Sequence, residues 1–380
     1  MHVLFAPDCF SGTLTAQQAG DAMAAGWAKH APDDVRDVCP MSDGGTGFVD
    51  ALAAGLGGEL SAVTVTGPQG EAVPAAVLLV ESDEGLTAYV ESAQACGLHL
   101  VPEHARDPLT TTSYGVGELI AHAVEVGARR IVVGLGGSAT NDAGVGMLAA
   151  LGAHTSDDVA LDMGGGVLAD LAELDLTMPR STLAGVELVA ASDVDNPLLG
   201  LTGATNSFAR QKGADDDAVM RLEAALEAVV AAIGRTDDGR NPAVAMGSGA
   251  AGGMGYGLLC LGAHRVPGIG TVADALNLTE RMSQADLVVT GEGCFDWTSL
   301  RGKVVTGVAQ AATAVARPCV VAAGTVLVGR RDYAAIGVTG AYSMADIVGS
   351  TDIAINDPWN SLATTAQRIA RTWSPAAGSP

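Results

Sequence analysis

The sequence predicts an α/β protein: a doubly wound parallel-sheet domain built from both termini, plus an inserted second α/β domain with a mixed sheet. Near each terminus, short apolar runs alternate with helical patterns in a β–loop–α–β order, which is typical of parallel sheets with helical crossovers. Between these regions, strand patterns follow one another around the turn signal Gly67–Gly70, which favours an antiparallel or mixed sheet. We therefore expect one domain over residues 1–60 and 274–380 and a second over residues 61–273.

Two strands and two helices are expected before residue 60. A capping box at Thr15 and Gln18 opens an alanine-rich helix that reaches about Lys29. The other elements of this region are a strand at 2–6, a strand at 35–39 and a helix at 48–56. Asp8 and Asp43 follow the two strands, so they fall at the carboxyl edge of the sheet, where functional loops lie.

The middle of the chain contains strand patterns first and then a mixture of strands and helices. The expected strands are 60–66, 73–80, 87–91, 131–133 and 186–190, and the expected helices are 115–126, 147–151 and 215–233. The polar, acidic stretch 156–180 is expected to be a surface excursion. The uncharged stretch 243–263 is long enough to span a bilayer, but its seven glycines predict a soluble glycine-rich segment instead.

The β–loop–α–β pattern returns near the C-terminus. It consists of a strand at 286–290, a helix at 304–315 and a strand at 318–322. Residues 374–380 are expected to be a frayed tail.

The stretch from Arg130 to Ala150 has the composition of an anion-binding turn. A buried strand at 131–133 is followed by three glycines and then by polar residues that can cap a helix. Glycine lets backbone N–H groups approach an oxygen ligand, and a helix start supplies free donors with partial positive charge. The alternative is an ordinary strand-to-helix connection, which also needs glycine and a cap. The residues concerned are Gly134, Gly136, Gly137, Ser138, Thr140, Asn141 and Asp142.

The net charge excludes several classes of partner. It is −23, so nucleic acid and anionic membrane surfaces, which require a basic patch, are not expected partners. An anionic substrate must meet local cations or a metal, because the overall field repels it. Only three lysines are present, and two of them, Lys212 and Lys303, lie beside a glycine.

Cysteine usage and the N-terminus indicate a cytoplasmic protein. The six cysteines contain no C-x-x-C pair, which argues against a disulfide framework or a zinc site and fits a reducing compartment. The N-terminal apolar run is too short for a signal peptide.

Three common motifs are absent or incomplete. Gly247–Gly252 fits G-x-G-x-x-G by letter, but no good strand precedes it and no acidic residue follows at the right distance. Gly302 and Lys303 lack the earlier glycine and the following Ser or Thr of a P-loop. Ser138 has no G-x-S-x-G elbow, which disfavours a serine hydrolase. A phosphate site in this chain is therefore expected to be of a non-P-loop type.

Several carboxylates and cations have the chemistry that phosphoryl transfer requires. Carboxylates can hold Mg²⁺ or accept the proton of the attacking hydroxyl, and fixed cations can stabilise phosphoryl oxygens. For any one carboxylate the alternative is a helix cap or an Asx turn, and for any one cation it is ordinary surface charge. The carboxylates near predicted strand ends are Asp8, Asp43, Asp193, Asp195, Glu292 and Asp296, and the cations are Arg210, Lys212, Arg301 and Lys303.

Together, the motifs of this chain resemble the type I glycerate kinase family, the bacterial ATP-dependent glycerate kinases. The segment Pro40–Gly47 (PMSDGGTG) is similar to the family signature P-M-A-D-G-G-E-G, and Thr290–Gly293 (TGEG) opens the last large motif. Other blocks that resemble the family are Ala6–Leu14, Thr112–Ile120, Gly134–Gly146, Asp193–Leu198, Gln211–Ala214 and Gly247–Gly255, with Asp296 and Gly302–Lys303. Ser11 and Cys294 depart from the family, which usually has a lysine and an arginine there.

The resemblance implies transfer of the ATP γ-phosphoryl group to D-glycerate with Mg²⁺, usually giving 2-phosphoglycerate. It also implies two α/β domains with an active cleft between them. Glycerate and ATP are then the small-molecule partners. A kinase of another small hydroxy acid and a non-catalytic ligand-binding relative are the alternatives. The choice of 2- or 3-phosphoglycerate, and of monomer or homodimer, stays open.

On this hypothesis, Asp193 is the candidate base, and Asp8 and Lys212 complete the catalytic group. The candidate Mg²⁺ ligands are Asp43, Glu292 and Asp296. The candidate ATP contacts are Gly136, Gly137, Ser138, Thr140, Asn141 and Gly291, and Lys303 and Arg301 are expected to hold the substrate carboxylate or phosphate oxygens.

Overall fold

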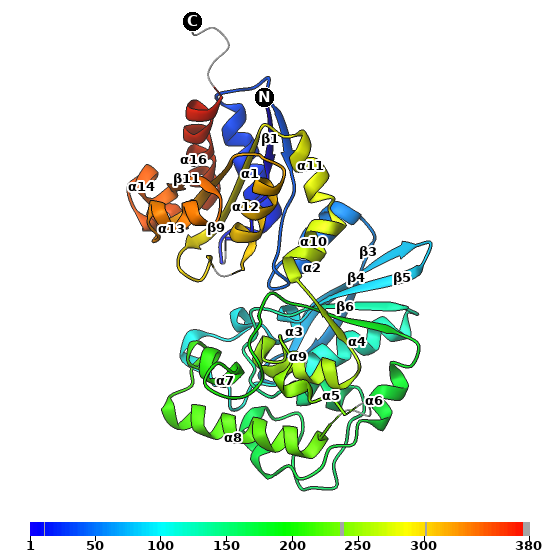
Figure 1. The fold of residues 1–380 in the computed structure, drawn as a ribbon. Helices are drawn as coiled ribbons and strands as arrows, with labels where there is room; N and C mark the ends of the chain where they lie inside the picture. Colours follow the sequence, from blue (N-terminus) through cyan, green and yellow to red (C-terminus); the bar gives the residue numbers. More distant parts are fainter. Residues whose placement is uncertain (11, 236–238, 301, 375–380) are drawn as a thin grey trace, which may run out of the picture. The chain divides into compact units, whose positions relative to one another are not determined.

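The structure is a computed structural model that describes residues 1–10, 12–235, 239–300 and 302–374. The chain divides into two compact units, which Figure 1 displays. Unit 1 comprises Met1–Asp43, Asp50–Gly57 and Ile269–Pro380, and unit 2 comprises Gly44–Val49 and Gly58–Gly268. The predicted α/β class is confirmed, with one parallel sheet and one mixed sheet. Ser11, Arg301 and the predicted tail beyond Ser374 lie outside the described residues.

Unit 1 is built on a five-stranded parallel sheet in the order β11-β10-β9-β1-β2. Its strands are β1 (His2–Phe5), β2 (Val35–Val38), β9 (Leu287–Phe295), β10 (Cys319–Val326) and β11 (Val338–Ser343). The strand order reverses beside β1, because β2 lies on one side of it and β9 on the other. This is the doubly wound arrangement, and its switch point lies between β1 and β9.

Helices cover both faces of this sheet. α1 (Ala16–Ala28) and α16 (Pro358–Trp373) contact each other and share a core with Val3 and Phe5 of β1. α12 (Val304–Ala314) contacts β9 and β10 with buried residues that are not part of that core, and α11 (Leu278–Gln284) contacts β1. The capping box at Thr15 and Gln18 is confirmed. The further helices are α2 (Phe48–Leu56), α10 (Gly268–Ala275), α13 (Arg330–Ala335), α14 (Met344–Val348) and α15 (Thr351–Asn356).

Unit 2 is built on a six-stranded sheet in the order β3-β4-β5-β6-β7-β8. The strands are β3 (Glu59–Thr66), β4 (Ala72–Ser82), β5 (Gly85–Glu91), β6 (Arg130–Gly134), β7 (Glu187–Ala191) and β8 (His264–Val266). β3 and β4 pair antiparallel around the predicted turn at Gly67–Gly70, and β4 and β5 also pair antiparallel, whereas β5 to β8 are parallel. The predicted mixed sheet is therefore confirmed.

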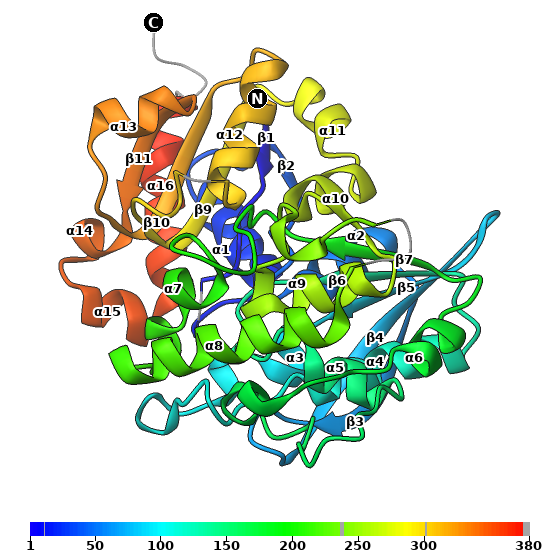
Figure 2. The same cartoon turned by 60° about the horizontal axis from the view of Figure 1, so that its bottom comes forward.

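The helices of unit 2 are α3 (Ala93–Cys96), α4 (Tyr114–Glu125), α5 (Val145–Ala150), α6 (Thr177–Thr182), α7 (Ala204–Phe208), α8 (Asp216–Ile233) and α9 (Ala250–Cys260). α4 and α5 lie side by side, as Figure 2 shows. Asp215 caps α8, because its side chain accepts a hydrogen bond from the Ala218 N–H.

Two stretches of unit 2 are more ordered and more buried than predicted. The glycine-rich stretch 243–263 contains the buried helix α9, interrupted by left-handed backbone at Ala251, Gly252 and Gly253. A Cβ on Gly252 would lie 1.9 Å from the Thr140 carbonyl oxygen, so the glycine permits a close backbone approach. The stretch 156–180 is not only a surface excursion, since Leu168, Leu171, Leu174 and Leu176 are buried.

The short segment Gly44–Val49 groups with unit 2, although the sequence pattern placed it before residue 60 in the terminal domain. The N–H groups of Gly47 and Val49 donate to the buried carboxylate of Glu91 at 3.0 and 3.2 Å. Glu91 ends β5, so this carboxylate ties the segment to the sheet of unit 2.

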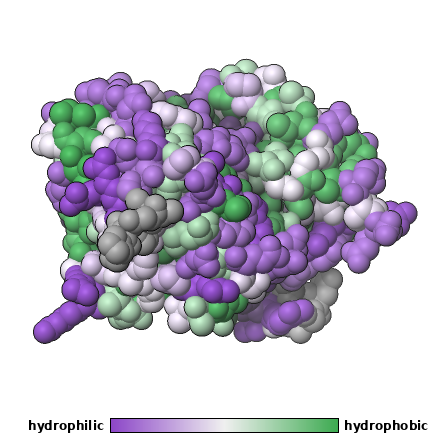
Figure 3. Space-filling view, turned by 90° about the horizontal axis from the view of Figure 1, so that it is seen from above, coloured by the Kyte–Doolittle hydropathy of each residue, from purple (hydrophilic) through white to green (hydrophobic). Residues whose placement is uncertain are grey.

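The surface gives no sign of a membrane-spanning element among the described residues. No described helix has the length and hydropathy needed to cross a bilayer. On the face in Figure 3, hydrophilic residues are mixed with small apolar patches.

Candidate active site

The first candidate region is the carboxyl edge of the unit 1 sheet at its switch point. Open α/β sheets bind ligands there, because loops leave the neighbouring strands in opposite directions and open a crevice. Asp8 follows β1, Asp43 follows β2, and Glu292 lies in the last part of β9. The three strands are neighbours in the sheet, and we name these three side chains the carboxylate cluster.

The members of the carboxylate cluster act on one another electrostatically. Burial raises the pKa of Asp8 well above its ordinary value, and the charges of Asp43 and Glu292 raise it further. A hydrogen bond of 2.7 Å from the Cys9 N–H opposes this shift. The Asp8 N–H donates to the Gly291 carbonyl oxygen at 2.8 Å, which fixes the loop after β1 against β9. The structure therefore brings together four residues predicted from the sequence, the three carboxylates of the cluster and Gly291.

The pKa of Glu292 is also raised. Burial raises its pKa to about 7, Ser299 and Lys303 lower it, and Asp296 and Asp43 raise it. Its Oε1 is buried and has no hydrogen-bond partner within the described residues. A buried carboxylate oxygen in this state is favourably placed to take a cation or a proton.

The chemistry of the carboxylate cluster fits Mg²⁺. Mg²⁺ prefers oxygen ligands and is usually held by one or two carboxylates, with phosphate oxygens and water completing its coordination. Among the described residues, no three carboxylate, thiol or imidazole side chains form a preformed metal site. The predicted trio Asp43, Glu292 and Asp296 is therefore not a complete cage, and a metal ion here would depend on oxygens from a ligand or from water.

Asp296 is engaged by its own loop. Its Oδ1 accepts hydrogen bonds from the Thr298 hydroxyl at 2.7 Å and from the Thr298 N–H at 2.8 Å, and these bonds lower the pKa of Asp296. Asp296 thus forms the Asx turn that the sequence allowed as the alternative to a role in metal binding or catalysis. Lys303 is the exposed N-cap residue of α12 and contributes to lowering the pKa of both Asp296 and Glu292. Cys294, at the position where the family usually has arginine, is exposed.

The second candidate region lies in unit 2 around Lys212. This side chain is only 3% exposed, and its Nζ donates to the Ser138 hydroxyl at 2.9 Å and to the Thr140 carbonyl at 2.6 Å. Burial lowers the pKa of Lys212 to about 8, against the opposing effects of Cys96 and Asp142. The structure therefore joins the predicted lysine to the predicted turn after β6.

Two other predicted residues of this turn are enclosed. Thr140 and Asn141 have no exposed surface, and Thr140 Oγ1 and Asn141 Oδ1 have no hydrogen-bond partner within the described residues. The Asn141 amide donates to the Thr205 hydroxyl at 3.0 Å. Ser138 and Lys212 retain a small exposed fraction, so they are the members of this group that can meet a ligand without a rearrangement.

The glycines of the turn have a packing role. A Cβ on Gly136 would lie 2.6 Å from the Gly45 Cα, and a Cβ on Gly134 would lie 2.6 Å from the Gly44 carbonyl oxygen. Gly137 has left-handed backbone with φ of +65°. The close approach of the Gly44–Gly45 backbone alone is enough to require glycine at 134 and 136.

The prediction that the helix start supplies free donors for an anion is wrong at α5. The helix begins at Val145 after Gly144, which has no side-chain cap. The buried carboxylate of Asp142 accepts hydrogen bonds from the N–H groups of Gly144 and Gly146 at 3.0 and 3.3 Å. It also accepts from the N–H and hydroxyl of Ser113 at 2.9 and 2.7 Å. The chain's own carboxylate thus occupies the place expected for a ligand.

The remaining predicted residues of unit 2 lie outside its strands and α-helices. Asp193 is half-buried, two residues beyond the end of β7. Asp195 is exposed and pairs with Arg265 at 2.7 Å. Arg210 is exposed and pairs with Asp216 at 2.7 Å, so the alternative of ordinary surface charge describes it.

Sequence reasoning missed two features of the site. Glu91 holds the Gly44–Val49 segment, and its only signal was an acidic residue at the end of an otherwise apolar strand. Cys96, which is buried near Lys212, carried no signal at all because its contacts come from tertiary packing.

Comparisons with known proteins identify the family of this chain. The family model described as "Glycerate kinase family" matches residues 3–374. A "Glycerate kinase" of Haemophilus influenzae is 40% identical over 377 residues and covers 98% of each chain. A "Glycerate 2-kinase" of Escherichia coli is 38% identical over 378 residues, again covering 98% of each. The crystal structure of a putative glycerate kinase 2 from Salmonella typhimurium LT2 has a TM-score of 0.77 at 36% identity and covers 98% of each chain. This chain belongs to the glycerate kinase family.

Proposed function

We propose that the chain transfers the γ-phosphoryl group of ATP to D-glycerate in a Mg²⁺-dependent reaction, with 2-phosphoglycerate as the product. The observation that carries this proposal is the carboxylate cluster at the switch point of unit 1, whose donor set suits a magnesium nucleotide. The relative named "Glycerate 2-kinase" supports the position of phosphorylation.

The carboxylate cluster and Lys303 form the unit 1 part of the proposed machinery. Asp43 and Glu292 are the proposed Mg²⁺ ligands, with Asp8 next to them. Bound Mg²⁺ supplies positive charge to the phosphate oxygens of the nucleotide. Lys303, and Arg301 as predicted from the sequence, offer further positive charge for a carboxylate or phosphate group.

Lys212 and Asp193 form the unit 2 part. Lys212 is proposed to donate a hydrogen bond to a phosphoryl oxygen, because its position beside Ser138 fixes the ammonium group. Its pKa of about 8 keeps most molecules charged at neutral pH. Asp193 is proposed to accept the proton of the glycerate hydroxyl as the bond to phosphorus forms.

A coupled assay of ADP release tests the proposal directly. With ATP, Mg²⁺ and D-glycerate the chain should turn over, and phosphorus NMR should show phosphate on the 2-hydroxyl. Asp193→Asn should fold and lose about 100-fold or more in kcat. A folded native chain that releases no ADP with D-glycerate would refute the substrate, and wild-type turnover by Asp193→Asn would remove this residue from the chemistry.

A kinase of another small hydroxy acid is the second candidate, and Cys294 is the observation that favours it. This exposed residue replaces the family's usual arginine in β9, only two residues beyond Glu292. We expect Cys294→Arg to lower the KM for D-glycerate by about tenfold if glycerate is the substrate but is held weakly. If another hydroxy acid of the assay panel is preferred, the same variant should shift preference towards glycerate. Cys294→Ser serves as the neutral control, and an equal KM in both variants would exclude a role for this position.

A further inference from the structure

Unit 2 contains a partly buried arginine, Arg106, to which the proposed reaction assigns no role. It directly follows the short 3₁₀ helix Glu103–Ala105, and its Nε is buried without a hydrogen-bond partner among the described residues. None of the ion pairs formed by described residues includes it. A buried N–H donor without an acceptor is costly, and a ligand that supplies an acceptor removes this cost.

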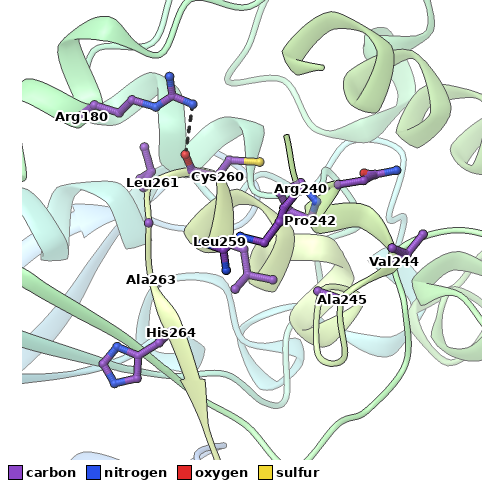
Figure 4. Close-up of a pocket in the computed structure, with 12 residues that line it drawn as sticks. Arg180, Arg240, Pro242, Val244, Ala245, Leu259, Cys260, Leu261, Ala263 and His264 are labelled. Carbon is purple, nitrogen blue, oxygen red and sulfur yellow. Dashed lines mark hydrogen bonds between the residues drawn. The ribbon is translucent and has the colours of Figure 1, made fainter. Parts of the chain in front are cut away.

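Other arginines of unit 2 direct their side chains at acceptors. Arg180 Nη2 donates to the Cys260 carbonyl at 3.4 Å, as the dashed line in Figure 4 shows. The Nε of Arg130 is also buried, but it lies 3.5 Å from Glu187 Oε2. The missing acceptor within the described part of the chain therefore distinguishes Arg106 from these two arginines.

Arg106 lies against the segment that carries Lys212. Gly213 has φ of +103°, and a Cβ on it would lie 2.2 Å from the Arg106 carbonyl oxygen and 3.0 Å from the Arg106 Cβ. Only glycine permits this approach. Lys212, the preceding residue, donates to the Ser138 hydroxyl at 2.9 Å. Arg106, Lys212 and the turn after β6 are therefore neighbours, and they bring two cations and a hydroxyl group to one region of unit 2.

The loop that carries Arg106 is fixed to the same turn at both of its ends. At its start, the Leu98 N–H donates to the Gly137 carbonyl at 2.7 Å. At its end, the Thr111 hydroxyl donates to the Ala139 carbonyl at 2.9 Å. A loop held in this way presents its arginine with little further loss of entropy when a ligand binds.

Two carboxylates lie close to these cations, and neither is paired with Arg106. Asp107, the next residue in the chain, accepts a hydrogen bond from the Leu109 N–H at 3.0 Å. The charge of Asp142 acts on Lys212, and this carboxylate accepts the four hydrogen bonds described above. Asp142 thus offsets part of the Lys212 charge, which leaves the guanidinium of Arg106 for an anion.

We propose that Arg106 binds the carboxylate of the hydroxy acid, through two parallel hydrogen bonds from its guanidinium to the two carboxylate oxygens. The identity of that acid as D-glycerate rests on the proposed function, whereas the recognition of a carboxylate does not. Lys212 remains the donor to the phosphoryl oxygen. The proposed base, Asp193, follows β7, which is the parallel neighbour of β6, so it lies at the same edge of the sheet.

A nucleotide phosphate is the competing ligand for Arg106. The acid is favoured because unit 2 also carries the proposed base for its hydroxyl, whereas the proposed ligands of the magnesium nucleotide belong to unit 1. The two ligands predict different kinetic effects, since loss of Arg106 would weaken binding of the acid in one case and of ATP in the other.

Kinetics of the full chain with D-glycerate and MgATP test the proposal. Arg106→Gln should raise the KM for D-glycerate about 100-fold and change the KM for ATP less than about twofold, because only the acid loses its anchor. Arg106→Lys should raise the KM for D-glycerate about tenfold, since an ammonium group keeps the charge but cannot form the paired hydrogen bonds. The matched control is Arg130→Gln, which removes an arginine with a buried Nε at the amino end of β6 and should change neither KM.

Binding without nucleotide separates this role from the proposed function. Saturation-transfer NMR compares D-glycerate with its neutral counterpart D-glyceramide, which keeps both hydroxyl groups. The native chain should bind the acid at least about tenfold more tightly, and Arg106→Gln should lose that preference and keep its affinity for the amide. D-lactate and tartronate are measured beside them, so that Arg106 is tested even if the native chain releases no ADP with D-glycerate.

Three outcomes would overturn the proposal. They are an unchanged KM for D-glycerate in Arg106→Gln, a rise in the KM for ATP as large as that for the acid, and no preference of the native chain for D-glycerate, D-lactate or tartronate over D-glyceramide. Loss of acid binding in Arg106→Gln, together with a native chain that does not turn over D-glycerate, would refute the substrate and keep the proposal. Thermal midpoints show whether each variant folds, and Arg106→Lys keeps the comparison possible should Arg106→Gln not fold.

Discussion

At the scale of single residues, Lys212 combines burial with a charge whose hydrogen bonds all go to neutral groups. Its ammonium group meets the Ser138 hydroxyl and the Thr140 carbonyl rather than a carboxylate. Burial lowers its pKa to about 8, and the opposing effects of Cys96 and Asp142 compensate only in part. A lysine in this state keeps its proton at neutral pH and is well suited to stabilise negative charge on a ligand.

Lys212→Met should retain the fold and lose about 100-fold or more in kcat, because a fixed cation is removed from a water-poor site. Lys29→Met, at an exposed lysine, is the matched control and should behave like the native chain. In the native chain, kcat should fall as the pH rises through about 8, where Lys212 loses its proton, whereas the Lys212→Arg variant should keep whatever activity it has up to pH 9. A native pH profile that is flat from 7 to 9 would contradict the role of this charge.

Glu292 makes stability depend on pH in a defined direction. Its pKa rises from 4.5 to about 7 on folding, so the folded chain binds this proton more tightly than the unfolded chain. The contribution of this proton to the free energy of unfolding is complete below pH 4.5 and is lost as the pH rises through 7. It amounts to at most about 3 kcal/mol.

We expect Glu292→Gln to be more stable than the native chain at pH 8 without Mg²⁺, measured by urea unfolding, and to gain less thermal stability when Mg²⁺ is added. Asp286→Asn, at an exposed carboxylate just before β9, controls for loss of charge alone. An equal Mg²⁺ response in Glu292→Gln and the native chain would exclude Glu292 as a ligand.

At the scale of elements, the kinked start of α9 is fixed by backbone contact. Gly252 adopts φ of +69°, and a Cβ there would lie 1.9 Å from the Thr140 carbonyl oxygen, which is the acceptor of Lys212. The glycines that lower helix propensity in this stretch are thus the residues that let it pack against the turn after β6.

Gly252→Ala should cost about 3 kcal/mol or more in the free energy of unfolding, because the backbone of α9 or of the turn must move. Gly262→Ala is the control that separates this clash from the effect of backbone conformation. Gly262 also has positive φ, but a Cβ there meets nothing within 4 Å. Its cost should be about 1 kcal/mol. Equal losses for the two variants in urea unfolding would show that backbone conformation, not the close approach, sets the requirement.

At the scale of the whole molecule, a net charge of −23 works against the compact state. Raising NaCl from 10 to 150 mM shortens the Debye length from about 30 to about 8 Å and screens this repulsion. The thermal midpoint should therefore rise over that range. A midpoint that falls would mean that attractive ion pairs such as that of Arg281 with Asp37 outweigh the repulsion.

The sequence predicted those parts of the fold and the site that follow from local pattern. The buried run at 131–133 and the turn at Gly67–Gly70 determined the parallel and antiparallel halves of the unit 2 sheet. The positions of Asp8 and Asp43 after parallel strands predicted their convergence. By contrast, the contact between Lys212 and Ser138 spans 74 residues and depends on tertiary packing. α9 was missed because packing overrides its glycine-rich propensity.

The anchoring of Gly44–Val49 by Glu91 has a consequence for how this protein can be divided. Residues 58–268 look like a continuous piece that could be expressed alone or exchanged with a relative. Cut at those points, the piece would lose the backbone of Gly44 and Gly45, against which Gly134 and Gly136 are fitted. The excised fragment would leave the end of β6 without the backbone that packs against it. A workable chimera must therefore include Gly44–Val49 as well as residues 58–268, for instance by circular permutation.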